Sequence, residues 1–172
     1  MKEYWLEHGP VASEPLQADL LPLSIYRQTH AATVIACHDV FIHYQGGILL
    51  IRRKTAPAVN ILWPIGGRIS RGLTTEESIR QKVKEECNLE LQEIRTLGFA
   101  RTYFSTDPFG HGKGTDSLNV IMAGKGMGDL KLDQHHEKPE VITPEYYFSI
   151  RETLHPYVRD YMDMEFKTEP SV

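Results

Sequence analysis

The chain has 172 residues, of which 41% are hydrophobic and 24% charged. This length suits one domain with a substantial core and is short for two, and the composition excludes an intrinsically disordered or membrane-embedded class. No apolar run approaches the roughly 18 residues of a membrane span, and the start of the chain has no signal-peptide core. The formal net charge of -4 provides no general attraction to nucleic acid. We therefore expect one globular domain in the cytoplasm, with no nucleic-acid or membrane partner.

The first 30 residues are interrupted by three prolines: Pro10, Pro15 and Pro22. A proline inside a helix removes a hydrogen bond and clashes with the preceding turn, so this segment cannot form a long helix. We expect turns and one short helix at about residues 22–28. Residues 1–30 are accordingly assigned to an N-terminal extension, and residues 31–172 to the domain, including a C-terminal helix.

A β-hairpin is expected at the start of the domain. Residues 31–44 are β-branched, aromatic and apolar, residues 45–47 read Gln-Gly-Gly, and residues 48–53 are again mostly apolar. Two such runs separated by a glycine turn are typical of a hairpin. Its second strand ends in Arg52 and Arg53, after which a loop leads back to a pair of glycines.

The next element is a helix with clear ends. Thr74 and Glu77 have the spacing of a capping box, which satisfies backbone amides at a helix start. Three apolar residues recur every four positions and form a stripe that can pack on a sheet, namely Ile79, Val83 and Cys87. Asn88 is expected to end the helix, because asparagine accepts the left-handed conformation of a C-cap. Cys87, like Cys37, lies in an apolar pattern, which favours a buried thiol over a disulfide or a metal pair.

The second half of the domain is expected to continue with strands at 97–104 and 118–123, a last strand at 140–148 and a helix at 150–164. The glycine-rich loop 105–116 is long enough to be functional or mobile, and three residues in or beside it are candidates for contacting a base or sugar: Tyr103, Phe109 and Lys113. A second loop covers residues 124–139, and its polar part is 129–139. This order of elements fits a mixed sheet between helices.

The stretch from Gly67 to Leu89 resembles the Nudix box. Five positions of that pattern are in place: Gly67, Val83, Glu85, Glu86 and Leu89. Four positions depart from it: Leu73 replaces a Glu, Gln81 an Arg, Lys82 a metal-binding Glu, and Asn88 a Gly. The resemblance implies the Nudix fold, an α/β/α sandwich with a mixed β-sheet.

Within that family, the chain resembles the GDP-mannose mannosyl hydrolase branch, which also lacks the carboxylate at Lys82. The resemblance implies one Mg²⁺, or Mn²⁺, held by Gly67, Glu86 and Gln134. It further implies that His135 is the general base and that Arg53 and Arg68 bind the substrate, a nucleoside diphosphate sugar. Glu85 and Lys82 are secondary site candidates. Family members are often dimers, so a homodimer is expected.

Two alternatives stay open at the sequence level. Lys82 either replaces the arginine missing at Gln81 beside the phosphates, or pairs with Glu86 and occupies the metal position, because an ammonium and a divalent cation compete for one carboxylate. The second case favours a different function, a catalytically impaired Nudix-fold module that binds or senses a nucleotide.

Overall fold

The computed structural model describes residues 1–4 and 21–166. Its helices are α1 (Leu23–Ala32), α2 (Thr75–Cys87), α3 (Pro144–Ile150) and α4 (Pro156–Phe166), with the short 3₁₀ helix η2 (Arg151–Thr153) between the last two. Its strands are β1 (Ile35–Tyr44), β2 (Gly47–Arg53), β3 (Leu62–Trp63), β4 (Ile65–Arg68), β5 (Glu90–Phe104), β6 (Thr115–Met127) and β7 (His136–Ile142). Of the expected N-terminal extension, residues 5–20 lie outside the described part of the chain.

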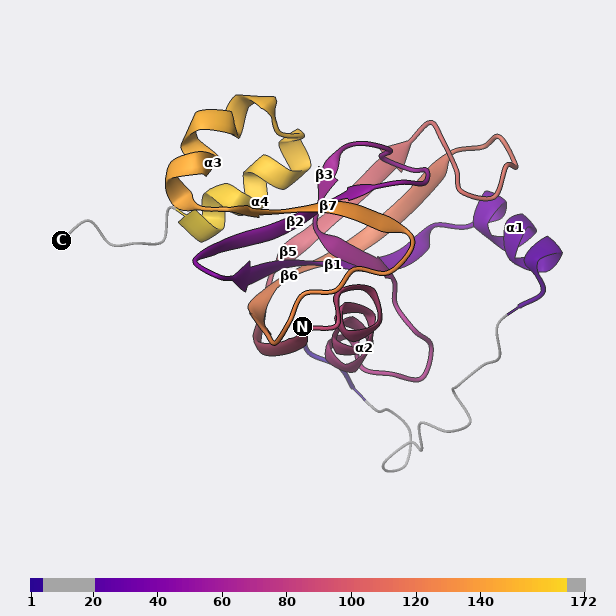
Figure 1. Cartoon of the computed structure of the whole chain (residues 1–172). Helices are drawn as coiled ribbons and strands as arrows, with labels where there is room; N and C mark the ends of the chain where they lie inside the picture. The colour runs from indigo at the N-terminus through magenta and orange to yellow at the C-terminus, as the bar shows by residue number, and fades with distance from the viewer. Residues whose placement is uncertain (5–20, 167–172) are drawn as a thin grey trace.

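Within the described ranges, the strands form one seven-stranded sheet with the order β3-β2-β1-β6-β5. β4 pairs with β1, and β7 pairs with β2. The pair β1 and β6 is parallel, whereas the other pairs are antiparallel. Helix α2 lies on one side of this mixed sheet, and α3 and α4 lie on the other (Figure 1). The α/β/α sandwich expected from the sequence is confirmed.

The two faces of the sheet carry separate apolar cores because side chains alternate along each strand. On β1, Val40 and Ile42 pack with the residues of α2, while Phe41 packs with those of α3 and α4. The predicted apolar stripe of α2 is fully buried in the core on the α2 side of the sheet: Ile79, Val83 and Cys87 are each 0% exposed. Burying one such side chain contributes about 1.5–3 kcal/mol, so α2 is held firmly on the sheet.

The ends of α2 are as the sequence predicts. The Thr74 side chain accepts a hydrogen bond from the backbone of Glu77, and the Glu77 side chain accepts one from the backbone of Thr74. Asn88 adopts the left-handed conformation, with φ of 60°. Both cysteines are free, Cys87 being buried and Cys37 half-buried.

The prediction of a strand at 140–148 is wrong beyond Ile142, where β7 ends. Thr143 caps a new helix by accepting a hydrogen bond from the backbone of Tyr146, and Pro144 occupies the first turn, where a proline is tolerated. The predicted helix at 150–164 instead begins at Pro156.

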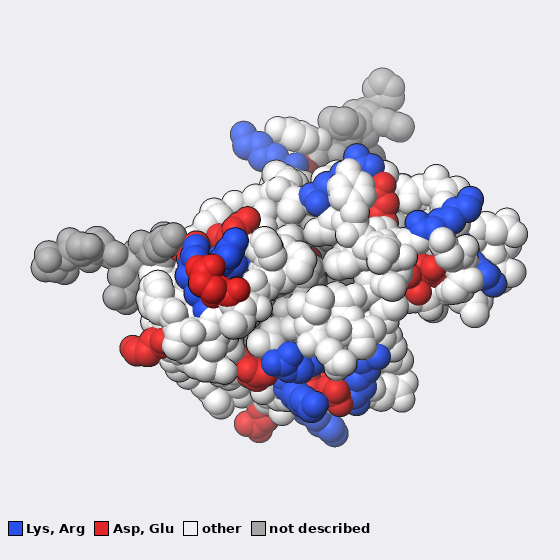
Figure 2. All heavy atoms as spheres, turned by 90° about the horizontal axis from the view of Figure 1, so that it is seen from above, with Lys and Arg blue, Asp and Glu red and all other residues white. Residues whose placement is uncertain are grey.

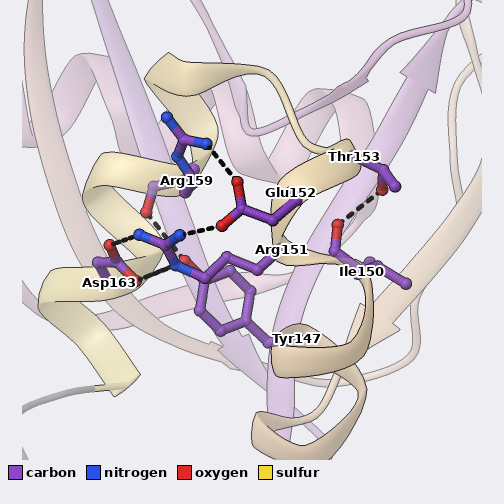
Figure 3. Close-up of polar contacts among 7 residues, drawn as sticks. All are labelled: Tyr147, Ile150, Arg151, Glu152, Thr153, Arg159 and Asp163. Carbon is purple, nitrogen blue, oxygen red and sulfur yellow. Dashed lines mark hydrogen bonds and ion pairs between the residues drawn. The ribbon is translucent and has the colours of Figure 1, made fainter.

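Helices α3 and α4 are joined by a polar network (Figure 3). The guanidinium of Arg151 donates two hydrogen bonds to the carboxylate of Asp163, and the hydroxyl of Tyr147 donates to the same carboxylate at 2.7 Å. Bidentate pairs of this kind fix geometry as well as charge. The network therefore stabilises the helical layer opposite α2.

Strands β5 and β6 are longer than predicted, and β7 starts at His136, within the predicted loop 129–139. On the face shown in Figure 2, basic and acidic side chains lie in mixed groups separated by uncharged surface. None of the helices in residues 21–166 combines the length and apolar character needed to cross a bilayer.

Candidate active site

The glycine pair lies on β4, antiparallel to β1, where Gly66 is opposite Asp39 and Gly67 is opposite His38. A side chain at Gly66 would collide with the Asp39 carboxylate and the His38 carbonyl, so only glycine fits. Gly67 has φ of +152°, and its open side faces the end of the Lys82 side chain. The absence of side chains here leaves the backbone of the loop accessible beside α2.

The charged residues of α2 divide between two faces of the helix. Glu86 is largely buried, with 14% of its side chain exposed, and its Oε1 lies 3.4 Å from the Lys82 ammonium. Glu85 is exposed and accepts a hydrogen bond from Gln81 at 2.8 Å. The two adjacent glutamates therefore have different environments, and Glu86 is the one beside the glycine loop.

Backbone hydrogen bonds tie the second polar loop to the end of α2. The amide of Lys131 donates to the carbonyl of Cys87 at 2.9 Å, and the amide of Asp133 donates to the carbonyl of Glu86 at 3.0 Å. The side chain of Asp133 then reaches His136, with 2.7 Å between Oδ1 and Nδ1. His136 in turn points its Nε2 at Glu86 Oε2, 3.7 Å away.

The resulting cluster of Glu86, Asp133 and His136 has the donor chemistry of a divalent-cation site. One ligand atom from each residue lies within 4.8 Å of the others. Glu86 Oε2 is buried and has no hydrogen-bond partner among the described residues, which is costly for a carboxylate oxygen unless a cation or donor satisfies it. The residues present therefore fit such an ion, with Lys82 as an internal competitor for the other oxygen of Glu86.

Electrostatics in this cluster follow from its burial. Burial raises the pKa of Glu86 to about 7, although the Lys82 ammonium lowers it in part. Burial also acts to raise the pKa of Asp133, but hydrogen bonds from His136 and from the backbone of His135 outweigh it, and the pKa is lowered. The pKa of His136 is lowered, chiefly by burial and against the hydrogen bond to Asp133.

Gln134 and His135, the predicted ligand and general base, are not part of this cluster. Both are exposed, and their ring and amide nitrogens lie 3.4 Å apart. Their backbone carbonyls accept hydrogen bonds from the side chain and the amide of Lys54. Neither Asp133 nor His136 is among the site residues predicted from the sequence, although the loop that contains them is predicted.

The two predicted substrate-binding arginines occupy separate surroundings. Arg53 is opposite His136 in the pairing of β2 with β7, and its buried Nε has no hydrogen-bond partner among the described residues. Arg68 lies over the ring of Tyr26 on α1, with its guanidinium carbon 4.4 Å from the ring centre, a cation–π contact. Arg53 is therefore the arginine adjacent to the Glu86 cluster.

A pocket of about 120 Å³ opens beside Arg53 and Gly67. Its polar lining includes Asp39, Thr102, Ser117 and Asn119, and its apolar lining includes Trp63 and Phe104. Asp39 accepts a hydrogen bond from Tyr157 on α4, and burial raises the pKa of Asp39 to about 6 despite this bond.

The aromatic residues of this pocket differ from those expected. Phe109 packs edge-on against Tyr26 and His30 of α1, at 4.9 Å between ring centres in each case. Tyr103 is 69% exposed and lies under Arg101. Phe104, one residue later on β5, points to the opposite face and contacts Trp63 at 5.7 Å. The sequence shows that side chains alternate between the two faces of a strand. Which of Tyr103 and Phe104 faces the pocket, however, follows only from the pairing of β5 with β6.

Comparisons with known proteins identify the family of this fold. The low-salt glycan biosynthesis protein Agl8 of Haloferax volcanii is 26% identical over 129 residues, covering 73% of this chain and 78% of Agl8. The MutT protein of Methanosarcina mazei has a similar structure, with a TM-score of 0.60 and 19% identity over 81% of this chain and 96% of that protein. The NUDIX domain of Shewanella oneidensis NrtR, solved with ADP ribose, matches with a TM-score of 0.58 and 12% identity over 84% and 99% of the two chains. A family model described as NUDIX domain matches residues 34–163, and the chain therefore belongs to the NUDIX domain family.

Proposed function

We propose that the protein is a divalent-cation-dependent Nudix hydrolase that acts on a nucleoside diphosphate linked to a sugar, of the GDP-mannose type. The observation that carries this proposal is the position of Arg53. Arg53 lines the pocket and is paired with His136 of the Glu86 cluster across β2 and β7. Its Nε is buried and has no hydrogen-bond partner among the described residues. A buried guanidinium N–H requires an anionic or polar acceptor, and phosphate oxygens match its geometry.

The names of similar proteins support the substrate class. The NrtR domain was solved with ADP ribose, and a Francisella tularensis ADP ribose pyrophosphatase was solved with AMP and a manganese ion. Agl8 is named for glycan biosynthesis. ADP ribose, which the first two names contain, is a nucleoside diphosphate joined to a sugar, which is the substrate class of the predicted branch.

In the proposed mechanism, Gly67 and Glu86 would hold Mg²⁺ or Mn²⁺ together with the loop 133–136, which includes the predicted ligand Gln134. Such an ion would neutralise charge on the diphosphate. Arg53 braces the phosphates from the pocket side, and Arg68 does so from β4. His135, exposed on the same loop, accepts a proton from the attacking water.

The pocket is proposed to hold the sugar or base. Its side chains offer a carboxylate, hydroxyls and an amide, which suit the hydroxyl groups of a sugar. Trp63 is stacked on Tyr157, with 4.7 Å between ring centres and 5° between planes, and is thereby fixed in orientation. Trp63 and Phe104 then supply the rigid apolar walls on which a ring can pack.

The test is a panel of nucleotide sugars incubated with Mg²⁺, with both products identified. Release of an intact nucleoside diphosphate and a free sugar indicates attack at the anomeric carbon, whereas a nucleoside monophosphate and a sugar phosphate indicate attack at phosphorus. The expected result is the first. Glu86→Gln is the negative control, and no turnover of any member by the unsubstituted protein would overturn the proposal.

The second candidate function is a nucleotide-binding or regulatory module without turnover. The observation favouring it is the contact between Lys82 and Glu86, together with Leu73 and Gln81 at positions where the Nudix box has a glutamate and an arginine. This candidate predicts that a nucleotide sugar binds equally well with and without Mg²⁺ and is recovered intact. The hydrolase predicts metal-dependent binding and loss of substrate. A homodimer remains part of the proposal on family resemblance.

A further inference from the structure

His136 is held between two carboxylates in an almost buried position, with 9% of its side chain exposed. Nδ1 lies 2.7 Å from Asp133 Oδ1, a normal hydrogen-bond length, whereas the 3.7 Å between Nε2 and Glu86 Oε2 is too long for one. Because the Asp133 carboxylate can only accept, Nδ1 carries the proton. The neutral ring then keeps its lone pair on Nε2, facing Glu86.

This arrangement is the one that surrounds metal-bound histidines. A histidine ligand commonly donates its other ring N–H to a carboxylate, which fixes the tautomer and the orientation of the ring. Glu86 Oε2, the atom that Nε2 faces, is buried and lacks a hydrogen-bond partner among the described residues. Two lone-pair donors facing one another without a shared proton are both satisfied by a cation between them.

We propose that His136 Nε2 and Glu86 Oε2 bind the divalent cation directly, with Asp133 positioning the imidazole, so that the site prefers a first-row transition-metal dication to Mg²⁺. Mg²⁺ takes oxygen ligands almost exclusively, whereas an imidazole nitrogen raises affinity for transition metals in the order Mn²⁺, Fe²⁺, Co²⁺, Ni²⁺. The inference rests on the proposed function, because the cation is the one that the hydrolase would use. It differs from the prediction based on sequence resemblance, in which the loop supplies Gln134 as an oxygen ligand.

The test is a titration of the metal-free protein with Co²⁺, followed by visible absorption, and with Mg²⁺, followed by calorimetry. Co²⁺ is expected to bind at least about tenfold more tightly than Mg²⁺, and His136→Gln is expected to weaken Co²⁺ binding by at least about tenfold. The same substitution should change Mg²⁺ affinity much less, because the lost nitrogen contributes little to that ion. His135→Gln is the matched control and should leave both metal affinities unchanged.

Asp133 provides a second pair of variants. Asp133→Asn keeps an oxygen that accepts the Nδ1 proton and should preserve the nitrogen-ligand signature in the Co²⁺ spectrum. Asp133→Ala removes that acceptor and should weaken Co²⁺ binding by about 10–100-fold. A purely structural role for Asp133 would make both variants equally defective in folding, with no difference in the spectrum per folded molecule.

Three results would overturn the inference: equal Co²⁺ affinity in His136→Gln and the unsubstituted protein, loss of Co²⁺ binding in His135→Gln, or an all-oxygen octahedral Co²⁺ spectrum. The last is measured on the unsubstituted protein and applies even if His136→Gln does not fold. Hydrolysis of the nucleotide-sugar panel is recorded separately. Turnover with Mg²⁺ and no metal preference refutes only the inference, whereas the expected Co²⁺ behaviour without turnover refutes only the proposed function.

Discussion

The ammonium of Lys82 lies 3.4 Å from Oε1 of Glu86, one helical turn away on α2. The other oxygen of that carboxylate has no hydrogen-bond partner among the described residues. The carboxylate is thus shared, with one oxygen on an internal cation and the other available to an external one. This division leaves one carboxylate oxygen for the proposed metal site, although a lysine stands where the Nudix box has a carboxylate.

Glu86→Gln is expected to weaken Mg²⁺ binding by at least about tenfold, equivalent to ~1.4 kcal/mol, because the amide lacks the charge that a hard cation requires. Glu85→Gln is the matched control. Glu85 is exposed and bonded to Gln81, so its substitution should leave Mg²⁺ affinity unchanged. Calorimetric titration of both variants checks the pair, and equal losses would reject the assignment to Glu86.

Lys82→Leu is expected to raise the KM for a nucleotide sugar by about tenfold or more, since a charge-assisted contact to phosphate is worth about 1.5–3 kcal/mol. Mg²⁺ affinity should change little, because Lys82 contacts Oε1 and not Oε2. Lys84→Leu is the control. That lysine is on the same helix but pairs with the exposed Glu90 at 2.8 Å.

A rise in Mg²⁺ affinity for Lys82→Leu, measured in the same titrations, would contradict this prediction. It would show that the ammonium occupies the metal position in the unsubstituted protein. The binding-module function would then be favoured over the hydrolase.

Much of α2, the helix that carries Glu86, could be predicted because the sequence patterns that define it are local. The capping box at Thr74, the apolar stripe of α2 and the C-cap at Asn88 all lie within a few turns, and each is found in the structure. The start of α3 could also be predicted from the local sequence, since Thr143 followed by Pro144 is a typical N-cap and first turn. The apolar and aromatic residues around it favoured a strand instead.

The cluster around His136 could not be predicted in the same way. It depends on the backbone bonds that tie residues 131 and 133 to the end of α2 and on the register that sets His136 opposite Arg53. Both are contacts between segments distant in sequence. Adjacent histidines carry no local signal for which of them turns inward, and a shift of one residue reverses the answer.

Asp39→Asn is expected to stabilise the protein above pH 6. Burial raises the folded-state pKa of Asp39 from 3.8 to about 6. The contribution of protonated Asp39 to the free energy of unfolding is therefore complete below pH ~4 and is lost as the pH rises through about 6. The size of this loss is on the order of 3 kcal/mol. Asparagine keeps an oxygen that accepts the Tyr157 hydroxyl and has no charge to bury.

Denaturant unfolding at several pH values from 4 to 8 measures this effect. The two proteins should have similar stability at the acid end, and the variant should become the more stable one as the pH rises. Asp116→Asn is the control, because the Arg101 hydrogen bond lowers the pKa of Asp116, so its difference in unfolding free energy from the unsubstituted protein should stay nearly constant above about pH 5. An unchanged difference between Asp39→Asn and the unsubstituted protein across this range would show that Asp39 is not buried as a charge.

The last prediction concerns the general base. His135 follows the predicted ligand Gln134 and is exposed on a loop, where it can approach bound substrate as the loop closes. His136 is almost buried and its Nδ1 is taken by Asp133, so it is poorly placed to accept a proton from water. His135→Gln is therefore expected to lower kcat by about 10²- to 10⁴-fold, the usual span for a general base. At saturating metal, His136→Gln should keep most of kcat, its defect appearing in the metal concentration required. Near-normal turnover of His135→Gln at saturating metal, in rate measurements on both variants, would assign the base elsewhere.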